Sequence, residues 1–227
     1  MDRSYRHEKK RKRKTGDSKK NIFCILGLLI AGIGVAVTKK GELGVSPVSS
    51  VANVLSLKYT ALTLGNWLII WNSILILGQI VILRRKFQPF QLLQVPMFFL
   101  FGYFTDFGMW IISSIEVDIY LMQLAMVLLG TVILGFGISI SVIANLILNS
   151  GEAFVKALSD TTHKEFGNLK IGFDITCVML AVILSLIFFE GKIEGTREGT
   201  IIAALFTGFV IRFFTKRIRG PLEKIMA

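Results

Sequence analysis

Six apolar runs constrain this chain more than any other feature. They lie at about Asn21–Val37, Tyr59–Leu83, Leu92–Ile112, Ile119–Ser141, Ile171–Phe189 and Thr200–Thr215. A helix needs about 20 predominantly apolar residues to cross the hydrocarbon core of a bilayer. The sequence therefore predicts an all-α integral membrane protein with about six transmembrane helices. Its 53% content of hydrophobic residues is high for a soluble chain and agrees with this class.

The distribution of Lys and Arg predicts the orientation of these spans. If the N-terminus is inside, twenty basic residues flank the spans on the cytoplasmic side and five on the outer side. Cytoplasmic loops of membrane proteins carry such an excess. We therefore expect a cell-membrane, multi-pass protein with both termini in the cytoplasm. Ten of the basic residues lie in the tail 1–20, which we expect to anchor on anionic lipid. Nucleic acid is not an expected partner, because the rest of the chain offers no basic, aromatic-interleaved surface.

A polar stretch, Lys39–Ser50, interrupts the apolar pattern after the first run. It holds two Gly, one Pro and three Ser, and the apolar residues Val51–Leu57 that follow are too few to span a bilayer. One interpretation is an external loop. The other is a re-entrant or half-helix segment, because irregular backbone at membrane depth is tolerated where it is buried in protein or lines a water-filled cavity.

Comparison of the two halves indicates an internal repeat. Gly102–Phe107 matches Gly208–Phe213 at an offset of 106, and Leu55-Ser56 matches Leu158-Ser159 at 103. Gly65 matches Gly172 at 107. Three spans in each unit would place the second unit upside down in the membrane, the plan of many transporters. The predicted organisation is a basic tail 1–20, a first three-helix repeat 21–117, a second repeat 118–219 and a short tail 220–227.

The repeat gives the polar stretch a counterpart. Asn145–Ser159 also follows an apolar span and is also broken by Gly and polar residues. It would lie on the opposite side of the membrane. Two such breaks in equivalent places favour the half-helix interpretation of Gly41–Ser56 and predict a cavity between them.

Two carboxylates within the apolar runs are candidates for function. A charged residue inside a span is costly and normally faces protein or water. Asp174 is near the cytoplasmic end of its run, so an interfacial position explains it equally well. Asp106 lies deeper, and its position in the repeat corresponds to that of Arg212. We expect either a structural ion pair between Asp106 and Arg212 or a role for Asp106 in a substrate or proton pathway.

Polar residues of the second run and of the two breaks complete the candidate site. Asn72 lies seven positions from Gln79 on the same helix face, where hydrogen bonds between helices are the simpler explanation. The predicted substrate or ion pathway comprises Ser46, Pro47, Asn66, Asn72, Asp106, Asn149, Glu152 and Asp174.

No grouping of residues predicts catalysis or a metal site. Cys24 and Cys177 both lie in apolar runs, and His7 and His163 are far apart in sequence. No Ser/His/Asp or Cys/His arrangement is present. We therefore expect a protein that is not an enzyme and binds neither a cofactor nor a metal.

The sequence resembles a known family. The residues that carry the likeness are Gly41–Ser50, Leu64–Asn72, Arg84–Phe87, Ile171–Asp174 and Gly195–Thr200. Together they are similar to the YczE/YyaS/YitT family of bacterial integral membrane proteins, over about residues 21–219. The resemblance implies a protein of the cytoplasmic membrane, with transport as the usual expectation and no established ligand residues. The long basic tail departs from the family.

Three functions fit these features. The first is a secondary-transporter-like carrier of an unknown small molecule across the lipid bilayer. The second is a substrate-binding membrane subunit of a larger transporter, similar in size to the vitamin-binding components of energy-coupling transporters. The third is a membrane scaffold for a cytoplasmic enzyme, docked through the basic tail. The sequence is also compatible with a homo-oligomer.

Overall fold

The computed structural model describes residues 2–144 and 149–226, with side chains from residue 18 onward. This part of the chain is helical, and its one β-bridge joins Gly44 to Thr196. The helices are α1 (Asp2–Lys40), α2 (Pro47–Lys58), α3 (Leu64–Leu83), α4 (Gln94–Ile111), α5 (Tyr120–Ala144), α6 (Ser150–Thr162), α7 (Phe166–Phe188) and α8 (Glu198–Met226), with short 3-10 helices η1 (Arg84–Lys86) and η2 (Pro89–Leu93) between α3 and α4.

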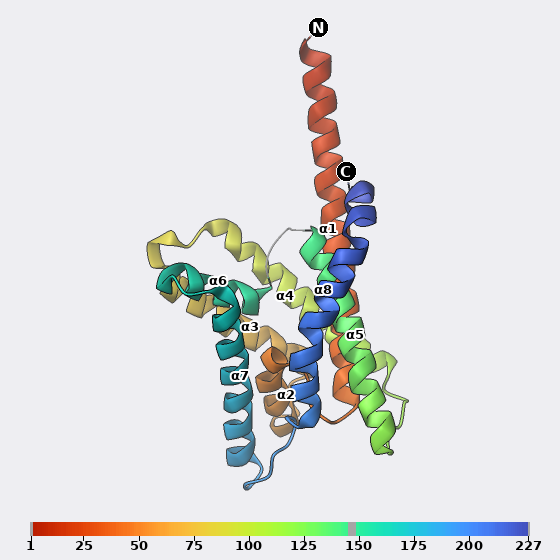
Figure 1. Ribbon diagram of the computed structural model, residues 1–227, viewed down its shortest axis with the longest axis vertical. Helices are drawn as coiled ribbons and strands as arrows, with labels where there is room; N and C mark the ends of the chain where they lie inside the picture. Colours follow the sequence, from red (N-terminus) through yellow and green to blue (C-terminus); the bar gives the residue numbers. More distant parts are fainter. Residues whose placement is uncertain (1, 145–148, 227) are drawn as a thin grey trace.

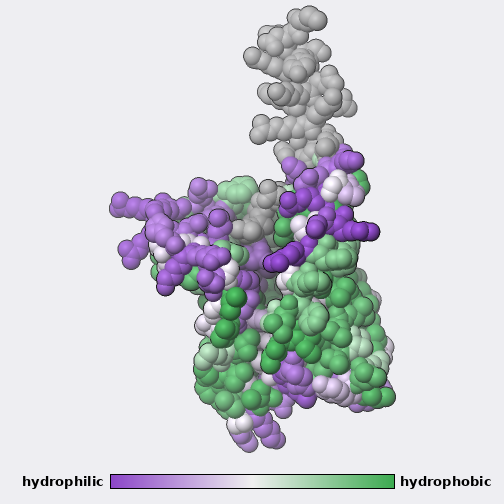
Figure 2. Space-filling model, in the orientation of Figure 1, coloured by the Kyte–Doolittle hydropathy of each residue, from purple (hydrophilic) through white to green (hydrophobic). Residues whose placement is uncertain are grey.

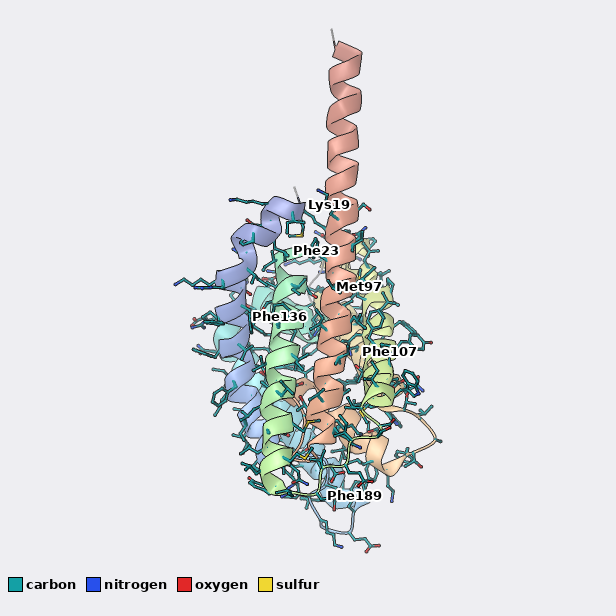
Figure 3. The ribbon with its side chains drawn as sticks, turned by 90° about the vertical axis from the view of Figure 1, so that its right-hand side faces the viewer. Lys19, Phe23, Met97, Phe107, Phe136 and Phe189 are labelled. Carbon is teal, nitrogen blue, oxygen red and sulfur yellow. The ribbon has the colours of Figure 1, made fainter. Side chains whose placement is uncertain are left out.

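The helices form two layers. In the first, α4, α1, α5 and α8 lie side by side in that order (Figure 3). Phe136 of α5 makes an edge-to-face contact with Phe214 of α8, with ring centroids 5.0 Å apart. Met97 of α4 packs on the cluster that contains Cys24 of α1. The second layer holds α2, α3, α6 and α7, where α3 packs on α6 and α2, and α7 packs on α2 and α6 (Figure 1).

A seam of glycines joins the two central helices, α1 and α5. Gly27 and Gly34 of α1 face Gly137 and Gly130 of α5, so that the two backbones meet without side chains between them. Small residues at helix interfaces allow this close approach in membrane proteins. Gly27 and Ala31, four residues apart on α1, therefore lie at a close helix contact whose partner is α5.

The predicted membrane class is confirmed. Within the described residues, five helices are long and apolar enough to cross a membrane: α1, α3, α4, α5 and α7. With α8, which is 29 residues long but has a basic C-terminal half, this agrees with about six spans. Figure 2 shows a green apolar belt with hydrophilic residues at both ends. Both termini lie at the same end of the molecule (Figure 1).

Two short helices interrupt the spans. α2 begins at Pro47, whose ring suits the first helical turn, after the cap residue Ser46. α6 begins at Ser150 after the cap residue Asn149. The N-terminal ends of α2 and α6 meet inside the molecule, where Val48 packs beside Gly151. The half-helix interpretation of Gly41–Ser56 therefore describes the first break, and α6 occupies most of the second. Asn145–Leu148 of that break lie outside the described residues.

α7 begins before its apolar run. The fifth run was expected to begin at Ile171, but α7 begins at Phe166. The extra turn contains Lys170, which forms an ion pair with Asp174 one turn later on the same helix. A paired charge can extend a helix beyond its apolar run, so hydropathy alone sets the start too late.

Candidate functional site

A cavity of about 950 Å³ lies between the two layers. Its inner wall includes Val35 of α1 and Leu68 of α3, and its far wall is formed by α8. At its other end it is lined by Lys86, Gln88 and Asp160, which are exposed. The cavity therefore reaches the surface at the end of the molecule that carries both termini, between α7 and α8 (Figure 2).

Contacts between α2 and its surroundings close the opposite end. Asn53 donates a hydrogen bond of 2.7 Å to the Gly195 carbonyl oxygen, and the Lys58 ammonium group donates one of 3.1 Å to the Phe188 carbonyl oxygen. Lys39, at the end of α1, donates to the Ser56 hydroxyl at 2.7 Å. These bonds hold α2 against α1, α7 and the α7–α8 loop. The cavity is thus open at one end and sealed at the other.

The N-terminal ends of both short helices line this cavity. Ser46 and Pro47 contribute from α2, and Asn149 and Glu152 from α6. The first amide groups of a helix lack partners within the helix and carry a partial positive charge. Four of the predicted pathway residues, from two breaks a hundred positions apart, are therefore brought together at one site.

Glu152 is the carboxylate of this site that has no partner among the residues the structure describes. It has no hydrogen bond or ion pair from its side chain within the described part of the chain. Burial raises its pKa above the ordinary value of a glutamic acid; Lys170 of α7 acts in the opposite direction and Asp174 adds to the rise, both less strongly. Asp174 also lines the cavity, but its carboxylate is already paired with Lys170.

The raised pKa of Glu152 predicts a stability difference that depends on pH. Ionised Glu152 destabilises the fold, so its penalty is absent below about pH 4, near the ordinary pKa, and grows as pH rises through the folded-state pKa. Glu152→Gln is uncharged at every pH. We expect its Tm to match that of the wild type at low pH and to exceed it by a few degrees at pH 8.5.

Thermal unfolding of the purified proteins at about pH 3.5 and pH 8.5 checks this result. Glu116→Gln, in the exposed loop between α4 and α5, is the matched control and should leave Tm unchanged at both pH values. An equal Tm for wild type and Glu152→Gln at pH 8.5 would show that ionisation of Glu152 carries no penalty.

The structure places Asp106 outside the cavity. Its carboxylate accepts a hydrogen bond of 2.6 Å from the Thr63 hydroxyl and one of 2.8 Å from the Gly65 amide, at the N-terminal end of α3. Arg212 instead lines the cavity from α8. The predicted ion pair between Asp106 and Arg212 is therefore not formed. Asn66 also lies outside the cavity lining, and its backbone amide donates a hydrogen bond to the Thr63 hydroxyl oxygen.

Two polar residues of α3 have different roles: Gln79 forms hydrogen bonds to neighbouring helices, and Asn72 lines the cavity. Gln79 exchanges amide hydrogen bonds of 3.3 and 3.2 Å with Gln94 and donates to the Ser150 carbonyl oxygen, which is the structural role expected for it. Asn72 lines the cavity and bonds within its own helix.

Trp71 and Lys170 are among the cavity residues that sequence reasoning missed. Trp71, which we would place in an interfacial belt by default, lines the cavity instead, and its indole N–H is buried without a partner in the described residues. The sequence around Trp71, including its neighbour Asn72, does not distinguish an interfacial position from a cavity-facing one. Lys170 was missed as a cavity residue, although its spacing of four from Asp174 is a signal that would have identified the pair.

Comparison with known proteins adds a family and two relatives. The model of a family of unknown function, DUF6198, matches residues 18–216. The chain is 28% identical over 193 residues to the "Uncharacterized membrane protein YczE" of Bacillus subtilis (strain 168), covering 84% of this chain and 83% of that protein. It is 26% identical over 196 residues to the "Uncharacterized protein YyaS" of the same organism, covering 86% and 92%. No solved structure matches.

Proposed function

The chain belongs to DUF6198, a family of unknown function, and from its cavity we propose that it is a secondary-transporter-like carrier of a small molecule. Membership confirms the resemblance seen in the sequence to the YczE and YyaS proteins. One observation carries the proposal: a 950 Å³ cavity opens at one end of a membrane-spanning fold and is sealed at the other. A carrier needs this arrangement, with access from one side at a time.

The order of the helices supports an inverted repeat. Each half has a long helix, a short helix and two further long helices. The cap residues of the two short helices, Ser46 and Asn149, are 103 positions apart, with φ/ψ of −57°/149° and −57°/147°. α3 and α7 begin 102 positions apart, at Leu64 and Phe166. In such folds the substrate site lies at the interface of the repeats, where broken helices end.

The orientation follows from the basic residues. The open end of the cavity carries both termini (Figure 1) and the basic segment Arg84–Lys86. Because basic loops favour the cytoplasm, we assign this end to the cytoplasmic side. The structure then corresponds to a carrier open to the inside. The proposed carrier performs no covalent chemistry on its substrate.

Glu152 is the charged group that a substrate or a coupling proton would meet in this cavity. Asp106 already accepts two hydrogen bonds, and Asp174 is bound to Lys170. Glu152 lies where the ends of α2 and α6 meet and has its side chain free of partners in the described residues. Cavity carboxylates with raised pKa are suited to bind and release a proton.

Filling the cavity is expected to abolish ligand binding and uptake. Thr207 lines the cavity from α8, and a tryptophan there would occupy the space of a ligand. Leu205, 71% exposed on the same helix, gives a matched control that adds the same ring to the outer face. We expect Thr207→Trp to reduce uptake by at least about tenfold, the loss expected when a buried binding surface is blocked, and Leu205→Trp to retain it.

The measurement proceeds in two steps. Wild-type protein in detergent is screened for small metabolites that raise its Tm, and each stabilising compound is then tested for uptake into liposomes that contain the purified protein. Uptake that Thr207→Trp leaves unchanged would contradict this cavity as the pathway, and the absence of uptake for every stabilising compound would contradict the carrier. A compound that binds tightly but crosses only when an ATPase copurifies would assign the chain to a larger transporter as its substrate-binding subunit.

A further inference from the structure

α3 and α4 touch through two glycines at the sealed end of the molecule. A Cβ atom on Gly65 would collide with the Gly102 carbonyl oxygen, and a Cβ atom on Gly102 would lie 2.7 Å from the Gly65 carbonyl oxygen. The two backbones are therefore in direct contact. Gly102 lies four residues before Asp106, one helical turn away on the same face.

Asp106 fastens this contact. Its carboxylate binds Thr63, the cap residue of α3, and the amide of Gly65 two positions later. A carboxylate at a helix N-terminus that accepts hydrogen bonds from an amide and a hydroxyl group is a strong anchor. The latch at the sealed end thus has four parts: Thr63 and Gly65 on α3, and Gly102 and Asp106 on α4.

The second half contains the same four parts with the same spacings. Glu165 is the cap residue of α7 and Gly167 follows two positions later; Gly208 and Arg212 lie four apart on α8. Each cap residue accepts a hydrogen bond from the asparagine three positions later, but only Thr63 caps its helix: Thr63 accepts from the backbone amide of Asn66, and Glu165 accepts from the side chain of Asn168. Glu165 and Arg212 are opposite in charge, so they complement each other as Thr63 and Asp106 do.

In the second half, however, these parts do not touch. Apart from its own stretch of helix, no atom of the described residues lies within 4 Å of a Cβ built on Gly167 or on Gly208. Gly208 and Arg212 face the cavity, and α7 and α8 have almost no direct contact along their described length. Arg212 forms no ion pair in the described part of the chain. The second half therefore contains the residues of a second latch, but the open end of the cavity separates those on α7 from those on α8.

We propose that α7 and α8 close the cytoplasmic mouth by packing Gly167 against Gly208, with Glu165 bound to Arg212. This gate rests on the proposed function: in the state open to the outside, the latch of the second half forms and that of the first half separates. Alternation between two equivalent latches on opposite sides is the movement that an inverted repeat permits. Each state then has one latch closed.

Charge reversal tests the pair. Val35 lines the innermost part of the cavity, so Val35→Cys, in a chain with Cys24→Ala and Cys177→Ala, reports which side is open. A membrane-impermeant maleimide is added outside intact cells. The background carries Asp106→Ala, which opens the first latch. We expect Glu165→Arg or Arg212→Glu to lower labelling from outside by about tenfold, and the double reversal to restore it, because the ion pair is rebuilt.

The results separate this gate from the proposed function. If Val35→Cys is not labelled from outside even with Asp106→Ala, the protein does not alternate and the carrier itself is contradicted. If that labelling occurs but neither reversal changes it, or the double reversal fails to restore it while the protein remains folded, the gate is overturned and the carrier stands. A disulfide between Gly167→Cys and Gly208→Cys, but not between Gly172→Cys and Gly208→Cys, is the second expected result.

Discussion

Replacing Gly137 by leucine is expected to abolish the folded protein. A Cβ atom at Gly137 would meet the Ala31 amide nitrogen and lie 2.6 Å from the Gly27 carbonyl oxygen. All of these neighbours are backbone atoms of α1, which cannot move aside as a side chain would. The two central helices must therefore separate along the glycine seam. Overpacking a core costs about 1–3 kcal/mol when side chains can adjust, and we expect a larger loss here.

The yield and Tm of purified protein in detergent check this expectation, with size-exclusion chromatography to detect aggregation. Gly172→Leu is the matched control, since Gly172 lies in α7 and no atom of another described helix or loop is within 4 Å of its Cβ position. We expect the control to be recovered like the wild type. Recovery of Gly137→Leu as a monodisperse protein with wild-type Tm would show that the seam does not hold α1 and α5 together.

Local properties of the sequence predict the membrane-spanning helices, but they do not predict which helices pack against each other. Apolar runs identify the spans because a bilayer demands a fixed length of apolar helix. Gly27 and Ala31 show that α1 approaches another helix closely, yet every other span is also apolar and several contain glycine. Nothing in α1 itself selects α5 as the partner. That choice depends on Gly130 and Gly137, a hundred positions later.

The error about Asp106 has a physical cause in the proposed repeat. The sequence match aligned Asp106 with Arg212, and an ion pair between them was one of the two roles that we expected for Asp106. In an inverted repeat, equivalent residues that lie away from the midplane are on opposite sides of it, so a match between such residues indicates a shared role and not a contact. The partner of Asp106 is the cap of α3, Thr63, which hydropathy does not mark.

The cavity residues were predicted best where the chain breaks. Ser46, Pro47, Asn149 and Glu152 all line the cavity, because polar residues and proline between apolar runs mark backbone that must be satisfied by protein or water. Trp71 was not predicted as a cavity residue, since an apolar aromatic residue suits a lipid-facing, interfacial or cavity-facing position equally well. Composition identifies the broken segments, whereas the faces of unbroken helices are decided by packing.

Asp106→Ala is expected to shift the protein from the inward-open to the outward-open state. The substitution removes both hydrogen bonds that fasten α3 to α4. Bonds to a charged group contribute about 1.5–3 kcal/mol each, and part of this is regained from water when the latch opens. A net loss of about 1.5–3 kcal/mol corresponds to a shift of about tenfold to a hundredfold in the equilibrium between the two states.

Labelling of Val35→Cys from the two membrane sides measures this shift. Outside labelling of Asp106→Ala should be at least about ten times faster than that of the parent chain, while labelling from the cytoplasmic side should fall, because one equilibrium governs both. Asp118→Ala, an exposed carboxylate of the α4–α5 loop, removes the same charge without touching the latch and should change neither rate. Faster labelling from both sides together would indicate a loosened fold and would contradict a two-state carrier. If the latch at the sealed end holds the protein in the inward-open state, the labelling rates from the two sides must change in opposite directions. Only exchange between the inward-open and outward-open states links the exposure of Val35→Cys on one face of the membrane to its exposure on the other.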